Sequence, residues 1–73
     1  MNKNFKYNIL LPKRKNYTDI IFWCDEMFGK RWDALRNRDG NWMVLWGGRE
    51  NFGNMRYSFC NEQDFLWFKL RWL

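Results

Sequence analysis

The chain has 73 residues, of which sixteen are Phe, Tyr or Trp, and its formal net charge is +5. This length allows a single domain. The absence of histidine and the presence of only two cysteines, Cys24 and Cys60, exclude the common Cys/His zinc sites, which need about four ligands. Since no stretch approaches the roughly 20 apolar residues that cross a bilayer, we expect one cytoplasmic domain over residues 1–73, with reduced cysteines and neither metal nor cofactor.

The first segment is predicted to be a strand. From Phe5 to Leu11, apolar residues alternate with Lys6 and Asn8, which is the period of a strand with one buried face. Pro12 should end it, because proline cannot donate to a ladder. A basic run follows, made of Lys13, Arg14 and Lys15. Residues 1–15 contain no acid, so this end is either a solvated basic edge or a contact for an anionic partner.

A helix is predicted from Tyr17 to Phe28, where apolar residues fall at helical spacing. Asn16 is a suitable N-cap, and Asp19 complements the positive end of the helix. Gly29 supplies the stop signal.

Two strands, Arg31–Asn37 and Asn41–Gly47, are predicted to form a hairpin around Asp39-Gly40, a strong signal for a two-residue turn. This register places Leu35, Trp42, Val44 and Trp46 on one face of the sheet, and Trp32, Ala34, Met43 and Leu45 on the other. A helix packs best over a small residue such as Ala34. We therefore expect the Ala34 face to be covered, which leaves Trp42 and Trp46 on the open face.

The last two elements are a strand, Met55–Cys60, and a helix that runs from Asn61 to the end of the chain. Asn61 is the predicted N-cap, with acidic residues in the first turn and Lys69 and Arg71 near the end. This helix is apolar nearly all round, so it is either buried by the rest of the fold or presents one side to a partner. We expect Trp32 and Trp67 in the core and Trp72 on the surface.

These elements predict an α+β fold, a two-layer sandwich in the order β-α-β-β-β-α. An antiparallel meander would carry both helices on one face. Residues 1–15 form its basic N-terminal strand and loop, and residues 16–73 form an α-β-β-β-α body.

The order of elements in that body resembles the double-stranded-RNA-binding-domain arrangement. That family uses a basic cluster at the start of its second helix to bridge phosphates. Here the helix begins Asn61-Glu62-Gln63-Asp64, which is acidic, and the first hairpin lacks the family's GPxH-type loop. The resemblance therefore implies the topology without the RNA site.

A second resemblance concerns the strings DGNWMVLWGG and FCNEQDFLWFKLRWL, which resemble small orphan proteins of tailed bacteriophages. Such proteins are accessory products that often bind a host or phage enzyme. The resemblance implies a non-enzymatic interaction protein and supplies no catalytic residues.

The residues themselves favour binding over catalysis. General acid–base chemistry lacks an imidazole, and Asp25 and Glu26, adjacent on a helix, point about 100° apart. The sixteen rings exceed what so small a core is expected to bury. We therefore expect a binding protein that modulates a host or phage protein, or that associates with itself, without membrane or small-molecule substrate. The predicted contact residues are Trp42, Trp46, Trp72, Arg36, Arg38, Lys13, Arg14 and Lys15.

The alternative is a nucleic-acid-binding module, in which aromatic rings on the open sheet face stack on single-stranded bases and the basic N-terminus neutralises phosphates.

Overall fold

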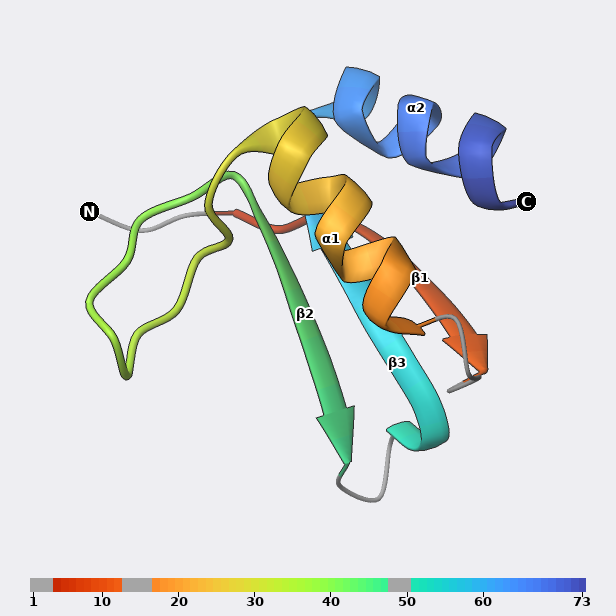
Figure 1. Cartoon of the computed structure of the whole chain (residues 1–73), viewed down its shortest axis with the longest axis horizontal. Coiled ribbons are helices and arrows are strands. Elements are labelled where there is room, and N and C mark those ends of the chain that lie inside the picture. The colour runs from red at the N-terminus through yellow and green to blue at the C-terminus, as the bar shows by residue number, and fades with distance from the viewer. Residues whose placement is uncertain (1–3, 13–16, 48–50) are drawn as a thin grey trace.

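The computed structural model describes residues 4–12, 17–47 and 51–73, apart from the side chains of residues 46, 47, 51 and 52. The predicted N-cap Asn16 and the basic run Lys13–Lys15 lie outside these ranges. The elements, in chain order, are β1 (Tyr7–Pro12), α1 (Tyr17–Phe28), β2 (Trp42–Gly47), β3 (Asn51–Phe59) and α2 (Glu62–Trp72) (Figure 1).

The three strands form an antiparallel sheet in the order β1-β3-β2, with the longest strand at the centre. Because side chains alternate between the faces, the register assigns each row of residues to one side. One face carries the rows Tyr7–Phe59–Trp42 and Ile9–Tyr57–Val44. The other carries Asn8–Ser58–Met43 and Leu10–Arg56–Leu45.

Both helices pack on the face that holds Tyr57 and Phe59. The Phe68 ring of α2 lies 4.9 Å from Tyr57 and 5.2 Å from Phe59, and the Phe28 ring of α1 lies 5.6 Å from Phe59. The two helices also meet each other, where Trp23 contacts Phe68. The predicted α+β two-layer fold, with both helices on one side of an antiparallel sheet, is confirmed (Figure 1).

The first helix has the predicted bounds. Ile20 and Cys24, one turn apart, are its buried residues, and Gly29 follows with a positive φ of 81°. The second helix begins after Asn61 as expected, but the Asn61 side chain makes no capping hydrogen bond. Asn61 thus occupies the predicted N-cap position, but its amide Nδ2 donates to the Asp64 carboxylate at 3.3 Å and its side-chain oxygen does not cap the helix. No helix in the described ranges is long and apolar enough to span a membrane.

The predicted strand Arg31–Asn37 is reduced to an isolated antiparallel bridge between Asp33 and Arg38. The predicted order β-α-β-β-β-α is therefore kept, but its second β element is only the bridge between Asp33 and Arg38. The reason is local: the Asp33 carboxylate accepts hydrogen bonds from the backbone N–H groups of Leu35 and Arg36, at 3.1 and 3.4 Å. Such bonds from an aspartate favour a turn over a ladder.

Candidate functional site

The predicted anchor Trp42 is not on the surface. Its side chain is fully buried beneath the helices, and its indole N–H donates to the carbonyl oxygen of Gly29 at 2.8 Å. The expectation that the Ala34 face is covered was also wrong. Ala34 lies in the turn of the 33–38 segment and is exposed, so it does not face a helix across the sheet. The covered face is the one that holds Trp42.

The other predicted tryptophans are also distributed differently from the expectation. Trp67, expected in the core, is 49% exposed on α2. Trp72, expected on the surface, is partly buried between Trp23, 6.0 Å away, and the Arg71 guanidinium, which lies 4.0 Å from its ring centre. Trp32 is partly buried in the segment before β2 and not in the core. The Trp46 side chain, like Lys13, Arg14 and Lys15, lies outside the described residues.

A short hairpin holds the remaining predicted residues, Arg36 and Arg38. We call Asp33–Arg38 the 33–38 loop. It is closed by two backbone hydrogen bonds between Asp33 and Arg38, each 2.9 Å, and by one from the Asn37 N–H to the Ala34 carbonyl at 3.3 Å. Asn37 completes the turn with a positive φ of 54°, a conformation that asparagine tolerates better than most residues.

This loop carries the most exposed large apolar side chain among the described residues. Leu35 is 99% exposed, although its own backbone N–H is bonded to Asp33. Its neighbours Arg36 and Arg38 are also exposed. The Arg36 Nε lies 3.9 Å from the Asp33 carboxylate, which is too long for a strong ion pair. The loop therefore presents a leucine, followed by two exposed arginines, on a backbone that is already ordered.

The base of the loop is fixed by a close approach of two backbone segments. A Cβ on Gly40 would clash with the Lys30 carbonyl oxygen and lie 2.8 Å from the Arg31 carbonyl carbon and from the Trp32 nitrogen. The Trp32 N–H donates to the Trp42 carbonyl at 2.8 Å, which ties the loop to β2. Only glycine fits at residue 40, where the chain passes close to the backbone of residues 30–32.

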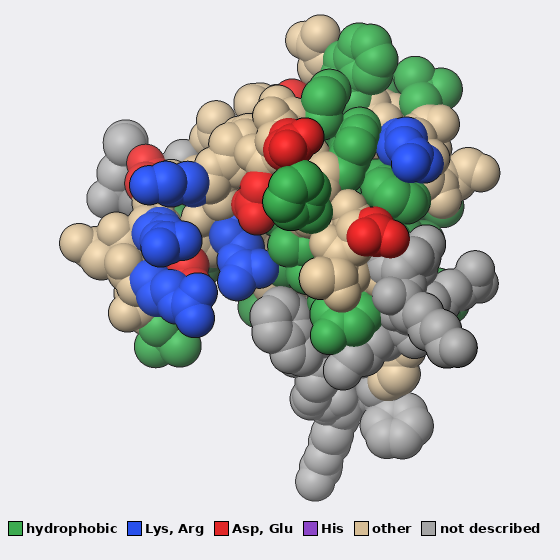
Figure 2. All heavy atoms as spheres, in the orientation of Figure 1, with side chains coloured by type: hydrophobic (Ala, Val, Ile, Leu, Met, Phe, Trp, Pro, Cys, Tyr) green, Lys and Arg blue, Asp and Glu red, His purple; other side chains and the backbone are tan. Residues whose placement is uncertain are grey.

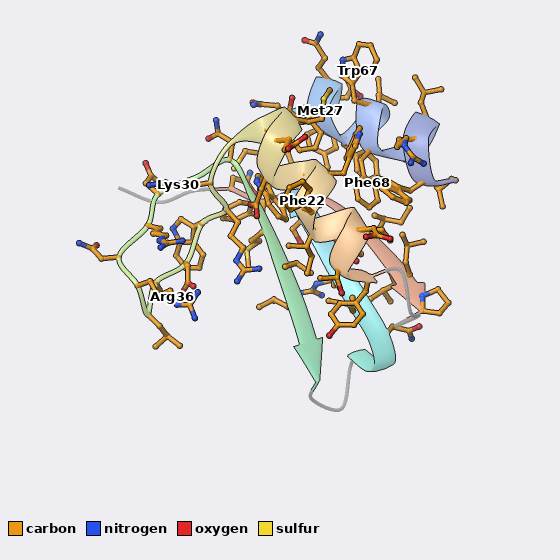
Figure 3. All side chains as sticks on the ribbon, in the orientation of Figure 1. Phe22, Met27, Lys30, Arg36, Trp67 and Phe68 are labelled. Carbon is orange, nitrogen blue, oxygen red and sulfur yellow. The ribbon has the colours of Figure 1, made fainter. Side chains whose placement is uncertain are left out.

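Four basic side chains gather on one side of this segment. Lys30, Arg31, Arg36 and Arg38, together with Ile21 and Asp25 of α1, line a hollow of about 460 Å³. Figure 2 shows the blue side chains grouped at the left of the molecule, and Figure 3 labels Lys30 and Arg36 within that group. In Figure 2, red acidic side chains lie between this blue group and green apolar side chains.

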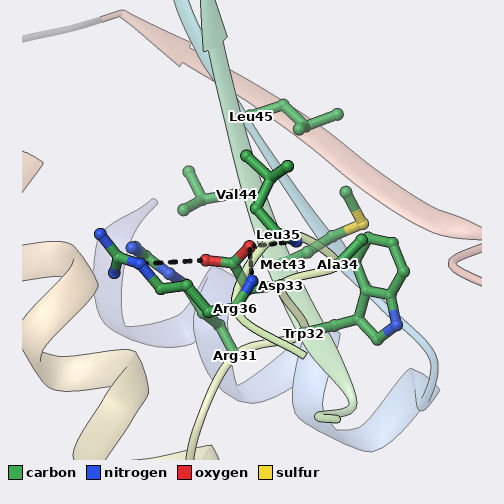
Figure 4. A pocket seen from close by; sticks show the side chains of 9 residues that line it. All are labelled: Arg31, Trp32, Asp33, Ala34, Leu35, Arg36, Met43, Val44 and Leu45. Carbon is green, nitrogen blue, oxygen red and sulfur yellow. Dashed lines mark hydrogen bonds and ion pairs between the residues drawn. The ribbon is translucent and has the colours of Figure 1, made fainter. Parts of the chain in front are cut away.

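A second, mainly apolar hollow of about 380 Å³ lies between the 33–38 loop and β2 (Figure 4). Trp32, Ala34, Met43 and Leu45 contribute to its lining, and Arg31 and Arg36 belong to both hollows. The Trp32 ring also lies 5.9 Å from Phe5, just before β1. This arrangement suits an extended apolar group flanked by carboxylates.

The open sheet face beside these hollows carries no ring from the central rows. Leu10, Arg56 and Leu45 form one row and Asn8, Ser58 and Met43 the next. The Ser58 hydroxyl donates to the Asn8 side-chain oxygen at 2.5 Å, while the Arg56 Nε is buried without a hydrogen-bond partner. The aromatic stacking surface expected for a nucleic-acid binder is thus on the helix-covered side.

The reactive side chains of the described region point to structural roles. Cys24 is fully buried, and burial, with a smaller contribution from Asp25, raises the pKa of its thiol well above the ordinary range. A protonated, inaccessible thiol is a poor nucleophile. The described residues contain no group of three or more side chains able to hold a metal ion.

Comparison with protein-family models, curated proteins and solved structures yields no match to this chain. The candidate site is therefore defined by geometry alone. Sequence reasoning identified Arg36 and Arg38 but missed Leu35, which it placed on a sheet face. The available signal was Asp33, a turn-forming residue two positions before Leu35.

Proposed function

We propose that this chain is a small, non-enzymatic, cytoplasmic accessory protein that binds another protein and modulates it, in the manner suggested by its resemblance to phage orphan proteins. The contact surface is the 33–38 loop with the apolar hollow beside it. The observation that carries the proposal is Leu35, a fully solvated leucine held on an ordered turn.

Leu35 is suited to enter an apolar pocket of the partner. Burying a leucine side chain contributes about 1.5–3 kcal/mol. The hydrogen bonds that close the loop reduce the conformational entropy that binding would otherwise remove. An isolated exposed leucine needs no explanation by itself. Here it lines an apolar hollow together with Trp32 and Leu45.

The surrounding charges indicate the chemistry of the partner. Arg36 and Arg38 follow Leu35 in the loop, and together with Lys30 and Arg31 they form one positive region. A partner with an apolar pocket bordered by carboxylates is the best complement. Such charges at the rim of an interface speed association more than they raise affinity.

Nucleic-acid binding is the second candidate, supported by the same four cations. The sheet rings Tyr7, Trp42, Tyr57 and Phe59 lie beneath the helices and are not available for stacking, so the phosphate backbone is the main contact for this candidate. Binding of this kind weakens steeply as salt rises, whereas insertion of Leu35 does not depend on salt.

The decisive experiment is site-specific photo-crosslinking in the native host cells. A photoreactive phenylalanine replaces Leu35 in one variant and Leu10, 48% exposed on β1, in the control. We expect a protein adduct from position 35 and none from position 10. An adduct with nucleic acid would favour the second candidate, and equal capture at both positions would reject the assigned surface.

The captured partner then allows a quantitative test with Leu35→Ser. We expect its affinity to fall by at least about tenfold, which corresponds to 1.4 kcal/mol. A fall of this size should not occur for Leu10→Ser. Affinity of Leu35→Ser within a factor of about two of the parent chain would contradict the role given to this leucine.

A further inference from the structure

The second helix has two apolar sides, of which the fold uses one. Phe68 is fully buried against the sheet, and Phe65 and Trp72 pack against the core beside it. The opposite side, which we call the outer α2 face, consists of Leu66, Trp67, Leu70 and Leu73. Their side chains are 50, 49, 81 and 67% exposed. Residues 66, 70 and 73 fall on one line of a helix that turns about 100° per residue, and residue 67 lies next to that line. Figure 3 labels Trp67 on α2.

A continuous apolar helix side differs from scattered surface leucines. Contiguous exposed apolar surface is a mark of association sites. Helices pack side by side when rows of residues four apart interdigitate, and Leu66 and Leu70 form such a row. The outer α2 face therefore has the form of one half of a helix–helix contact.

The charges along the two edges of this face follow a regular order. Glu62 and Lys69 lie on one edge, seven positions apart, and Asp64 and Arg71 lie on the other with the same separation. Each edge thus has an acid near the start of the helix and a base near its end.

A second copy of the same helix, related by a two-fold axis and running antiparallel, matches this order on both edges. Such an axis keeps like edges together and reverses their direction. Glu62 of one copy then faces Lys69 of the other, and Asp64 faces Arg71. The midpoints of the two pairs fall near residues 66 and 67, so the axis passes through the apolar centre.

The charges of these four residues are not neutralised within the described part of the chain, although the Asp64 carboxylate accepts one hydrogen bond from the Asn61 amide at 3.3 Å. The Lys69 ammonium lies 5.2 Å from the Phe65 ring centre, and the Arg71 guanidinium lies over Trp72. Neither contact neutralises the charge. Lys69 and Arg71 form no ion pair with an acid within the described part of the chain; the close contact between Arg36 and Asp33 is elsewhere, in the 33–38 loop.

We propose that the outer α2 face is a self-association surface, which joins two copies through antiparallel packing of α2. It is separate from the 33–38 loop, so a dimer would present two copies of that loop. A parallel pair would place like charges opposite one another, which is unfavourable.

Sedimentation equilibrium of the full chain tests this proposal. We expect a monomer–dimer equilibrium with a Kd below about 1 mM. Leu66→Gln with Leu70→Gln, which keeps the helix propensity, should weaken the dimer at least about tenfold. The matched control Leu10→Gln, at an exposed leucine of β1 with no assigned role, should leave it unchanged.

Charge reversal tests the electrostatic pairing, and crosslinking tests the orientation. The Lys69→Glu, Arg71→Glu variant and the Glu62→Lys, Asp64→Lys variant should each dimerise less than the parent chain, and an equimolar mixture should recover the heterodimer. In a Cys60→Ser background, Gln63→Cys should form disulfides with Leu70→Cys of the other copy, and not with itself. Far-UV circular dichroism checks that each variant is folded.

A chain that stays monomeric up to about 1 mM would overturn the proposal, as would a dimer that the Leu66, Leu70 variant leaves intact. Crosslinks between two copies of Gln63→Cys would overturn the antiparallel geometry. None of these outcomes bears on the 33–38 loop, whose role is decided by the photo-crosslinking experiment.

Discussion

The interior and the exterior of this protein differ in the kind of apolar residue they hold. Among the residues that the structure describes, four of the eight buried core residues are aromatic: Trp42, Tyr57, Phe59 and Phe68. Of the nine exposed large apolar residues in the same ranges, six are leucines and two, Phe22 and Trp67, are aromatic. Most of the described rings are therefore buried or partly buried, and leucine is the commonest large apolar residue in solvent.

The geometry of the rings explains this distribution. Phe59 has its ring centre within 6.0 Å of Phe28, Phe65 and Phe68, in edge-to-face and tilted arrangements. Aromatic pairs of this kind contribute about 0.5–1.5 kcal/mol beyond their buried area. Since each ring fills a large volume, a small core built from rings has no further space for the leucines of the helices and loops. Surface leucines are then available for contacts between molecules.

The largest effect is expected from loss of a core ring. Phe59→Ala should lower the free energy of unfolding by about 3–5 kcal/mol, which is comparable to the whole stability of a small domain. Phe22→Ala, at a side chain 64% exposed, should change it by less than about 0.5 kcal/mol. Urea denaturation measures both. If both variants lost similar amounts of unfolding free energy, the proposed difference between buried and exposed rings would be contradicted.

A smaller effect is expected at the base of the 33–38 loop. Gly40→Ala should lower the free energy of unfolding by about 2–4 kcal/mol, because the new Cβ meets backbone atoms that cannot move aside independently. The control is Gly29→Ala. It has open space around its Cβ and should lose only the roughly 1–2 kcal/mol of a left-handed conformation. If the two losses are equal, the close approach at Gly40 does not hold the loop.

Alkaline pH should weaken the core while leaving the exposed surfaces unaffected. Burial raises the pKa of the Cys24 thiol, and burial with the neighbouring Cys24 raises the pKa of Tyr57 to about 12. The native state therefore retains protons that the unfolded state releases above about pH 8.5 for cysteine and about pH 10 for tyrosine. Below about pH 8.5 the free energy of unfolding should keep its full value. Above it, that free energy should fall by up to about 1.4 kcal/mol per pH unit for each group.

Urea titrations between neutral and strongly alkaline pH would measure this decline. Cys24→Ala should move its onset upward, toward the ordinary tyrosine pKa of about 10. Tyr57→Phe should remove the part of the decline in the free energy of unfolding that begins near pH 10. A decline whose onset does not change in Cys24→Ala would show that other groups cause it.

The smallest effect on stability is expected at Leu35. Leu35→Gln removes no contact within the chain, so its free energy of unfolding should stay within about 0.5 kcal/mol of the parent value. Thermal or urea denaturation is sufficient to measure this. A larger loss would mean that Leu35 packs against the chain and is not free for a partner.

The sequence was sufficient to predict the fold class, both helices and three of the strands, because their periodic patterns and terminal signals agree. It could not decide which face of β2 is covered. Trp42 and Val44 alternate with Met43 and Leu45, so both faces are apolar. The answer depends on which of them pairs with the apolar face of β3, and that is a matter of register.

The two candidate surfaces were harder to predict from the sequence, because local signals conflict in one and packing decides the other. Leu35 was assigned to a strand because the Asp39-Gly40 signal outweighed the weaker turn tendency of Asp33. In the folded chain the Asp33 hydrogen bonds favour the turn. For α2 the sequence did predict an apolar residue on every side, but packing alone could show that Phe68 is inside and Leu70 outside.

The most direct test is the unfolding of a triple variant, Leu35→Gln, Leu66→Gln and Leu70→Gln, measured at a concentration where the parent chain is monomeric. If rings hold the fold together and these leucines serve contacts between molecules, the free energy of unfolding should change by no more than about 1.5 kcal/mol in total. A loss greater than about 3 kcal/mol, the size expected for a core residue, would contradict the account.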